Sequence, residues 1–252
     1  MSDYPLISII TVVYNGASTL EQTTLSVINQ TYKNIEYIII DGGSTDGTID
    51  IIKKYEDKLA YWISEPDEGI YNAMNKGIMK ASGEWILFLN SSDSFYSNTV
   101  LDEIKIFFQS SSADVLYGDT ICIFPNNIKK KIPASNIKTM KKKIPFCHQS
   151  CFIKTELAKD NLFDLKYKIC GDYNQFFNLY ENGSLFMYMP FTISNYNQSK
   201  CGISNSNERN MLIEMKQINK TNKKILFESK LFFTIKKRCP SFLIDIYRRL
   251  RY

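Results

Sequence analysis

Residues 6–16, LISIITVVYNG, and residues 35–48, IEYIIIDGGSTDGT, decide the fold of this chain. Each begins with an apolar, mostly β-branched run, over Leu6–Val13 and Ile35–Ile40, which is typical of a strand buried on both faces. Each run then ends in a polar turn. Between them, residues 17–30 have apolar side chains at helical spacing, with Leu20, Leu25 and Ile28 expected on the buried side. The sequence therefore predicts a strand–helix–strand unit.

The alternation of strands and helices continues along the chain. Strands are expected at 61–63, 85–89 and 115–118, and helices follow Asp46 and cover 70–80, 100–108 and 172–182, the last ending at Gly183. Such alternation indicates an α/β fold with a mostly parallel central sheet and right-handed crossovers. Ligands of these sheets bind outside the carboxyl ends of the strands. Residues 120–150 break the rhythm and favour a β-hairpin with a basic loop.

Composition excludes several classes of protein. The chain has 252 residues, of which 44% are apolar and 23% are charged, so it can bury a sizeable core and is neither disordered nor fibrous. No apolar window of about 18 residues occurs, so no bilayer-spanning helix is expected. The first ten residues lack the basic leader of a secretory signal. The six cysteines show no CxxC spacing, and we expect them to stay reduced in the cytosol.

Charge is distributed unevenly. The net charge is +5, but residues 1–120 carry −10, residues 121–219 carry +7 and residues 220–252 carry +8. Residues 120–150 alone hold seven lysines and no acid. A solvated loop explains those lysines by themselves. The basic tail, in contrast, favours an anionic partner such as a membrane surface, a pyrophosphate or a nucleic acid.

Three polar, acidic clusters fall where strands end. They are residues 41–48, DGGSTDGT, residues 65–75, EPDEGIYNAMN, and residues 89–93, LNSSD. Each alone is compatible with an ordinary turn or with acids that stabilise a helix start. A carboxylate before a glycine turn also accepts hydrogen bonds from a base or ribose. A carboxylate at the mouth of a parallel sheet suits Mg²⁺ or Mn²⁺, which bind one or two carboxylates together with substrate phosphates.

Together these motifs resemble the family 2 glycosyltransferases. The resemblance rests on residues 8–16, SIITVVYNG, on the DGGSTDGT turn and on residues 83–93, GEWILFLNSSD, and it covers roughly residues 5–200. It implies a GT-A (Rossmann-like) fold, a nucleotide-sugar donor, a divalent cation (Mn²⁺ or Mg²⁺) and inversion at the anomeric carbon.

The resemblance also implies roles for particular residues. Asp93 occupies the last position of the metal motif, although Asn90 and Ser92 stand where many relatives carry acids. Asp172, preceded by Gly171 instead of a second acid, matches the catalytic base that takes the acceptor proton, with a helix N-cap as the competing interpretation. The donor would be bound by Thr11, Val13, Asn15, Asp41, Asp67 and Asn72, and the diphosphate or acceptor by His148 and Gln149.

The second half and the tail complete the expected organisation. Residues 1–204 would form the transferase domain, with a nucleotide-sugar-binding half over 1–120 and an acceptor-binding half over 121–204, and residues 205–252 a basic helical extension. After Pro240, apolar and basic residues separate onto two helical faces, which suits a helix lying on an anionic leaflet. A helix packed on the domain is the alternative. We therefore expect a cytoplasmic protein, peripheral on the inner face of the cell membrane.

The sequence thus predicts an inverting hexosyltransferase. The expected donor is UDP-glucose or UDP-galactose, and the acceptor a lipid-linked glycan such as N-acetylglucosaminyl-diphospho-undecaprenol in O-antigen or other polysaccharide synthesis. A nucleotidyltransferase is the alternative enzyme, but the first strand ends in Tyr14-Asn15-Gly16 and not in a phosphate-cradling glycine loop. A nucleic-acid-binding module is the non-enzymatic alternative. Only Phe124 and Phe146 accompany the lysines, so no nucleic acid is expected.

Overall fold

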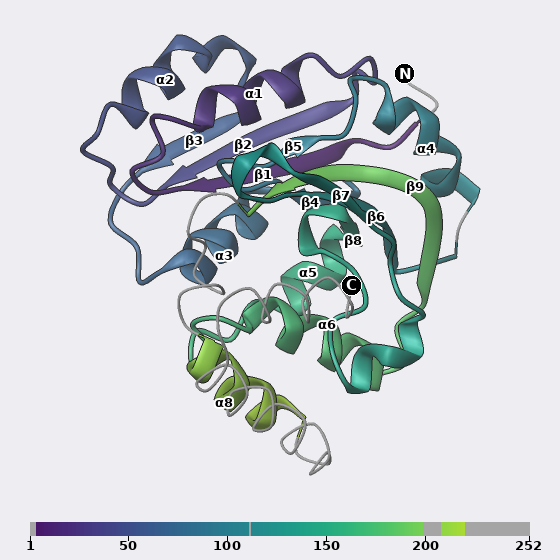
Figure 1. Cartoon of the computed structure of the whole chain (residues 1–252). Coiled ribbons are helices and arrows are strands. Elements are labelled where there is room, and N and C mark those ends of the chain that lie inside the picture. Colours follow the sequence, from purple (N-terminus) through teal and green to yellow (C-terminus); the bar gives the residue numbers. More distant parts are fainter. Residues whose placement is uncertain (1–3, 111, 199–207, 220–252) are drawn as a thin grey trace.

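The computed structural model describes residues 4–110, 112–198 and 208–219. Its first half is the predicted parallel sheet, in the order β3-β2-β1-β4. These strands are β1 (Ile7–Val13), β2 (Ile35–Asp41), β3 (Tyr61–Ser64) and β4 (Trp85–Phe88). Every residue of β1 is buried, because the strand is central and covered on both faces. The carboxyl ends of these four strands therefore lie along one edge of the sheet (Figure 1).

The second half of the sheet is mixed. Strand β8 (Cys151–Lys154) runs antiparallel to both β4 and β6 (Val115–Ile123) and so joins the two halves. On the far side of β6, the long β9 (Phe186–Asn197) runs parallel to it, and β5 (Ser94–Phe95) pairs antiparallel with β9. The predicted hairpin forms between β6 and β7 (Lys129–Ile132).

Helices cover both faces of the sheet (Figure 1). One face packs against α1 (Leu20–Ile28), α2 (Thr48–Lys54) and α4 (Val100–Ser110), and the other against α3 (Ile70–Lys80), α5 (Thr155–Asp160) and α6 (Gly171–Glu181). Short 3₁₀ turns lie at η1 (Glu56–Lys58), η2 (Pro125–Asn127), η3 (Ile137–Lys141) and η4 (His148–Ser150). The apolar side chains buried between the sheet and the helices form one cluster on each face of the sheet. Burial of these two clusters supplies most of the favourable free energy of folding.

Helix α1 differs from its prediction. It begins at Leu20, and Leu25, which we expected to be buried, is 37% exposed. The inner face instead carries Thr23 and Thr24, whose hydroxyls find internal partners: Thr23 Oγ1 donates to the backbone carbonyl of Asp93 at 2.7 Å. Satisfied threonines can replace apolar residues on a buried face. The predicted end of α6 is confirmed, because Gly183 has φ +84° and its N–H donates to the carbonyl of Tyr180.

Helix α8 (Glu208–Ile218) packs on α6. Its Glu214 carboxylate accepts the backbone N–H groups of Lys168, Ile169 and Cys170 at 2.8–3.0 Å, and Ile218 is buried. The first part of the expected extension therefore belongs to the same core as α6. The predicted amphipathic helix after Pro240 lies outside the described residues. Within those residues, no helix combines the length and apolar character that crossing a membrane requires.

Candidate active site

The loops after β1, β2 and β4 are tied together at the carboxyl edge of the sheet. The Asn15 backbone N–H donates to Ser44 Oγ at 2.7 Å, and Asn15 Oδ1 accepts the Thr45 N–H at 3.0 Å. Asn15 has φ +50°, a left-handed conformation that asparagine tolerates better than most residues. Thr19 Oγ1 lies 2.9 Å from Ser91 Oγ, so the loop after β4 joins the same assembly. Asn15 therefore lies at the expected donor edge, with an exposed side chain.

Asp41 braces this edge from the inside. Its carboxylate is 0% exposed and accepts hydrogen bonds from the N–H groups of Gly43 and Ser44 and from the hydroxyls of Ser44 and Ser64, the last at 2.6 Å. The expected contact of Asp41 with a base or ribose stays a prediction, and in this structure both carboxylate oxygens already accept hydrogen bonds from inside the protein.

Thr11 and Val13 are also covered. Thr11 is fully buried, and its hydroxyl donates to the Leu89 carbonyl at 2.7 Å, while Val13 is 5% exposed. Both side chains are therefore covered by the protein in this structure. Their expected place beside the nucleotide stays a prediction.

Asp67 and an exposed tyrosine meet over Gly42. A Cβ atom on Gly42 would lie 2.5 Å from Asp67 Oδ2, so the Asp67 carboxylate would have to shift, and 3.4 Å from Tyr14 Cδ2, which is ordinary contact. The other Asp67 oxygen accepts the Gly69 N–H at 2.8 Å. Tyr14 is 68% exposed. An aromatic ring and a carboxylate over a bare turn suit a planar, hydrogen-bonding ligand. We did not single out Tyr14 from the sequence, although a tyrosine directly after a buried strand is a usable signal.

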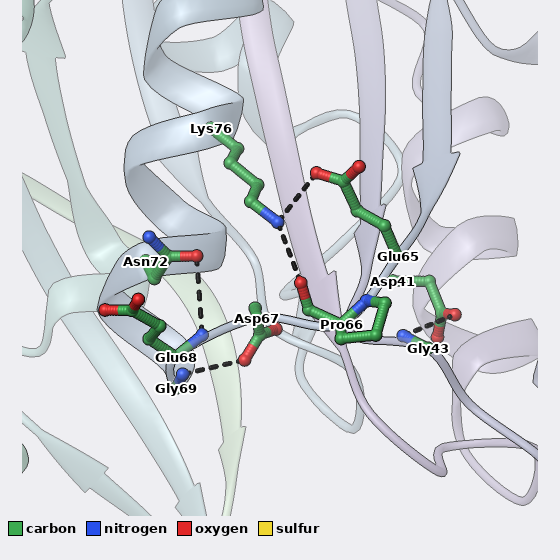
Figure 2. A network of polar contacts seen from close by, with 9 residues as sticks. All are labelled: Asp41, Gly43, Glu65, Pro66, Asp67, Glu68, Gly69, Asn72 and Lys76. Carbon is green, nitrogen blue, oxygen red and sulfur yellow. Dashed lines mark hydrogen bonds and ion pairs between the residues drawn. The ribbon is translucent and has the colours of Figure 1, made fainter.

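Helix α3 holds the loop that carries Asp67. Figure 2 shows Lys76 reaching back to this loop, where Nζ lies 2.8 Å from Glu65 Oε1 and 3.2 Å from the Pro66 carbonyl oxygen. Asn72 Oδ1 accepts the Glu68 N–H at 3.5 Å, a long contact. The predicted pair Asp67 and Asn72 is therefore brought to one loop, with Asn72 supporting it from the helix.

Asp93 and Gln149 come together although 56 residues separate them. Asp93 is 2% exposed, and its two oxygens accept hydrogen bonds from Gln149 Nε2 and from the Asn197 N–H, both at 3.0 Å. Burial raises the pKa of Asp93 to about 7. Gln149 Oε1 meanwhile accepts the Cys147 thiol. Gln149 thus uses both ends of its amide inside the protein, and its expected contact with a diphosphate or acceptor stays a prediction.

Two observations fit a cation at the turn of residues 90–93. Asn90 Oδ1 is buried and has no donor among the described residues. Burial raises the pKa of Asp93, and no ion pair of this carboxylate occurs among the same residues. Across the described residues, however, no three His, Cys, Asp or Glu side chains form a metal-binding group. The protein would therefore supply one carboxylate and neutral oxygens, and the remaining ligands would come from donor phosphates and water, which suits Mg²⁺ or Mn²⁺.

His148 lies in an aromatic cage. Its ring centroid is 5.1 Å from that of Phe88, 5.9 Å from that of Phe163 and 5.7 Å from that of Phe176. The side chain is 8% exposed, and burial lowers its pKa against the opposing effect of the Asp172 charge. The structure therefore buries His148 among three phenylalanine rings, in surroundings that favour the neutral imidazole.

Asp172 stands in the first turn of α6, half-buried, with Cys170 at the N-cap position. Its Oδ1 accepts the Tyr173 N–H at 2.8 Å and the Tyr71 hydroxyl at 3.3 Å. No donor among the described residues contacts Oδ2. The residue is thus not the helix N-cap, and one carboxylate oxygen is available to a ligand. Tyr71, which helical spacing alone assigns to the core, is a contact that sequence reasoning missed.

The chain belongs to the family described as glycosyl transferase family 2, whose model matches residues 8–162. It is 31% identical over 208 residues to a "PGL/p-HBAD biosynthesis glycosyltransferase" of Mycobacterium tuberculosis, covering 80% of each chain. It is also 31% identical over 196 residues to an uncharacterised glycosyltransferase of Rickettsia prowazekii, covering 72% of this chain and 61% of the relative. The protein is therefore a glycosyltransferase.

Solved structures share the fold. The crystal structure of Staphylococcus aureus TarS residues 1–349 in complex with UDP-GlcNAc superposes with a TM-score of 0.63 at 20% identity, over 78% of this chain and 60% of that 1–349 chain. The mannosyltransferase PcManGT of Pyrobaculum calidifontis, in complex with GDP-Man and Mn²⁺, gives a TM-score of 0.65 at 17% identity, over 88% of this chain and 66% of that one. This chain thus spans about two thirds of these structures.

Proposed function

We propose that the protein transfers a hexose from a UDP-sugar, with inversion, onto a lipid-linked glycan acceptor. The observation that carries the proposal is the Asp172 carboxylate, which is held through one oxygen at the start of α6 while the other oxygen has no donor among the described residues. A fixed, half-buried carboxylate beside the donor edge is what a general base for an acceptor hydroxyl requires.

In this reaction Asp172 takes the proton of the acceptor hydroxyl while the hydroxyl oxygen attacks the anomeric carbon. The bond from that carbon to the diphosphate oxygen breaks on the opposite face, so the nucleoside diphosphate leaves with the bonding electron pair and the configuration inverts. His148, held neutral by burial beside Asp172, is suited to hydrogen-bond the acceptor without adding charge.

The donor would lie on the edge formed by Tyr14, Asn15 and Asp67. Tyr14 offers an exposed ring for a nucleobase, and Asp67 an oxygen that lies over Gly42. Asp41 and Thr11 hold these loops from behind. The uridine nucleotide is supported by the fold shared with TarS, which was crystallised with UDP-GlcNAc. UDP-glucose and UDP-galactose remain our first choices.

A divalent cation would be held by Asp93 with help from the Asn90 amide oxygen. When bound, it would offset the negative charge that develops on the departing diphosphate. Asp93 must lose its proton to bind a cation, and its hydrogen bonds to Gln149 and Asn197 orient the carboxylate.

An anionic acceptor is supported by the lysine face, which we define as Lys138, Lys142 and Lys143, in and directly after η3. None of these has an ion-pair partner within the part of the chain that the structure describes. The face adjoins the base, because Tyr173, the neighbour of Asp172, donates its hydroxyl to the Met140 carbonyl of η3 at 2.8 Å. Uncompensated positive charge beside the base favours an acceptor that carries a diphosphate.

Residues 220–252 support attachment to the inner face of the cell membrane, with a net charge of +8 and an amphipathic pattern after Pro240. A protein attached there would lie on the same membrane surface as its lipid-linked acceptors. O-antigen or other surface polysaccharide synthesis is the process that such an acceptor indicates.

The test is a donor panel assayed for released nucleoside diphosphate. UDP-glucose, UDP-galactose, UDP-N-acetylglucosamine and GDP-mannose are each incubated with and without a synthetic N-acetylglucosaminyl-diphospholipid, in Mn²⁺ or Mg²⁺ and in EDTA. We expect release of UDP that depends on acceptor and cation. Release from GDP-mannose alone would reject the uridine donor, and release that is insensitive to acceptor would reject the lipid-linked substrate.

A further inference from the structure

Tyr71 connects the donor loop to the base. It lies in the first turn of α3, directly after the loop that carries Asp67, and it is buried. Its hydroxyl is 2.7 Å from the Ile169 carbonyl oxygen and 3.3 Å from Asp172 Oδ1, so one proton is shared between two acceptors. One side chain of the first half of the chain thus reaches the carboxylate presented by the second.

The ring of Tyr71 also shapes the start of α6. A Cβ atom on Gly171 would lie 2.8 Å from three atoms of this ring, a distance that real Cβ atoms essentially never show. The glycine that replaces the usual acid before Asp172 therefore makes room for Tyr71.

The loop before Asp172 is held from two sides. Tyr71 binds the carbonyl of Ile169, and Glu214 of α8 accepts the N–H of the same residue at 3.0 Å. Burial, followed by the charge of Asp172, raises the pKa of Tyr71 well above its ordinary value. The hydroxyl therefore stays protonated and remains a donor at physiological pH.

We propose that Tyr71 is a positioning residue that fixes Asp172 Oδ1, so that Oδ2 faces the acceptor hydroxyl. This inference rests on the proposed function, in which Asp172 is the base. With Oδ1 held by the Tyr71 hydroxyl and the Tyr173 N–H, the carboxylate has one orientation. A misplaced base lowers turnover without weakening donor binding.

The experiment is a double-mutant cycle in the full chain with Tyr71→Phe and Asp172→Asn. Tyr71→Phe keeps the ring against Gly171 and removes only the hydroxyl. We expect kcat for transfer to fall about tenfold, with KM for the donor and the calorimetric affinity for UDP unchanged. In the Asp172→Asn background, Tyr71→Phe should cause no further loss, because it acts through the carboxylate.

Tyr32→Phe is the matched control. It also removes a buried hydroxyl that donates to a backbone carbonyl, that of Pro5, which precedes β1 at the opposite edge of the sheet. We expect it to lower the melting temperature about as much as Tyr71→Phe while leaving kcat unchanged. Equal kcat losses in the two variants would overturn the inference, because both would then reflect stability.

A readout that needs no activity is the amide resonance of Tyr173, since this N–H donates to Asp172 Oδ1. Tyr71→Phe should shift it and Tyr32→Phe should not. If the Tyr173 resonance does not move in Tyr71→Phe, the inference is overturned, whether or not the chain transfers sugar. The proposed function is rejected by a different result, which is that the parent chain transfers no sugar. Full kcat in Tyr71→Phe beside an inactive Asp172→Asn overturns the inference alone, and full kcat in Asp172→Asn rejects Asp172 as the base.

Discussion

Asp41 accepts hydrogen bonds from two backbone N–H groups and two hydroxyls, so it organises the donor edge without facing it. His148 and Asp93 are likewise enclosed. Burial lowers the pKa of His148 and raises the pKa of Asp93, so the neutral form of each side chain is favoured. At the scale of single residues, the buried polar side chains hold the site in shape. The exposed Tyr14 and the half-buried Asp172 are the ones that we propose to contact the substrates.

Asp41→Ala should therefore lower stability as well as UDP affinity. The substitution leaves the Ser44 and Ser64 hydroxyls and two N–H groups without their acceptor, and each buried orphan costs about 1–3 kcal/mol. We expect urea unfolding to show a loss of at least about 2 kcal/mol. Unchanged stability together with lost UDP affinity would instead support Asp41 as a direct ligand, as the sequence predicts.

His148→Phe should remove part of the sensitivity to acid. Burial lowers the pKa of His148 in the folded state, whereas in the unfolded chain the pKa is about 6.5. The stability that the neutral imidazole contributes is thus present above pH 6.5 and is lost as pH falls below it. Phenylalanine suits the cage of three phenylalanines and does not titrate. Thermal melts at pH 7.5 and 5.0 should show that the melting temperature of the variant, relative to that of the parent, is higher at pH 5.0 than at pH 7.5. The same difference in melting temperature at both pH values would contradict this.

At the scale of elements, the parallel half was predictable, whereas in the second half β6, its hairpin with β7 and α6 were predictable but β8 and β9 were not. Strands β1, β2 and β4 are buried on both faces, so each appears in the sequence as an apolar run. The four residues of β8 and the proline inside β9 give no comparable signal. Their pairing depends on contacts between distant segments, as does the meeting of Asp93 with Gln149.

The lysine face, in and directly after η3, gives a prediction at this scale. Lys142→Gln/Lys143→Gln should raise KM for a diphosphate acceptor about tenfold at low salt, because a lysine at a phosphate contributes up to about 1 kcal/mol in water. Stability should hardly change, since both side chains are exposed. Lys53→Gln/Lys58→Gln, on α2 and η1, is the control. Equal effects of the two pairs would contradict a dedicated acceptor face.

At the scale of the whole molecule, specific contacts join the two halves around the site. Gln149 holds Asp93, Tyr71 reaches Asp172, and the Asn75 amide exchanges two hydrogen bonds with the backbone of Phe163. Phe163 in turn packs on His148. The donor edge and the base therefore belong to one connected structure. Sequence patterns locate such residues one by one, but they do not show which of them touch.

Removing residues 240–252 should release the protein from anionic membranes. Each arginine near an anionic surface contributes about 1 kcal/mol, and the apolar face adds burial. We expect that the truncated chain no longer sediments with anionic liposomes and that its KM for a lipid-linked acceptor rises. Its turnover on a water-soluble acceptor analogue should be unchanged. Binding of the full chain should weaken as salt rises. A truncated chain that still pellets and melts much earlier would show that the segment packs on the domain.

The most direct test of the account is the turnover of Asp172→Asn with a UDP-sugar and a diphospholipid-linked acceptor. Asparagine keeps the size and the Oδ1 acceptor but cannot take a proton. We predict a loss of kcat of about 10² to 10⁴ with unchanged calorimetric affinity for UDP, and an inverted anomeric centre in the product of the parent. A variant that keeps most of its kcat, or a parent that retains the configuration of the donor, would contradict the assignment of Asp172 as the base of an inverting glycosyltransferase.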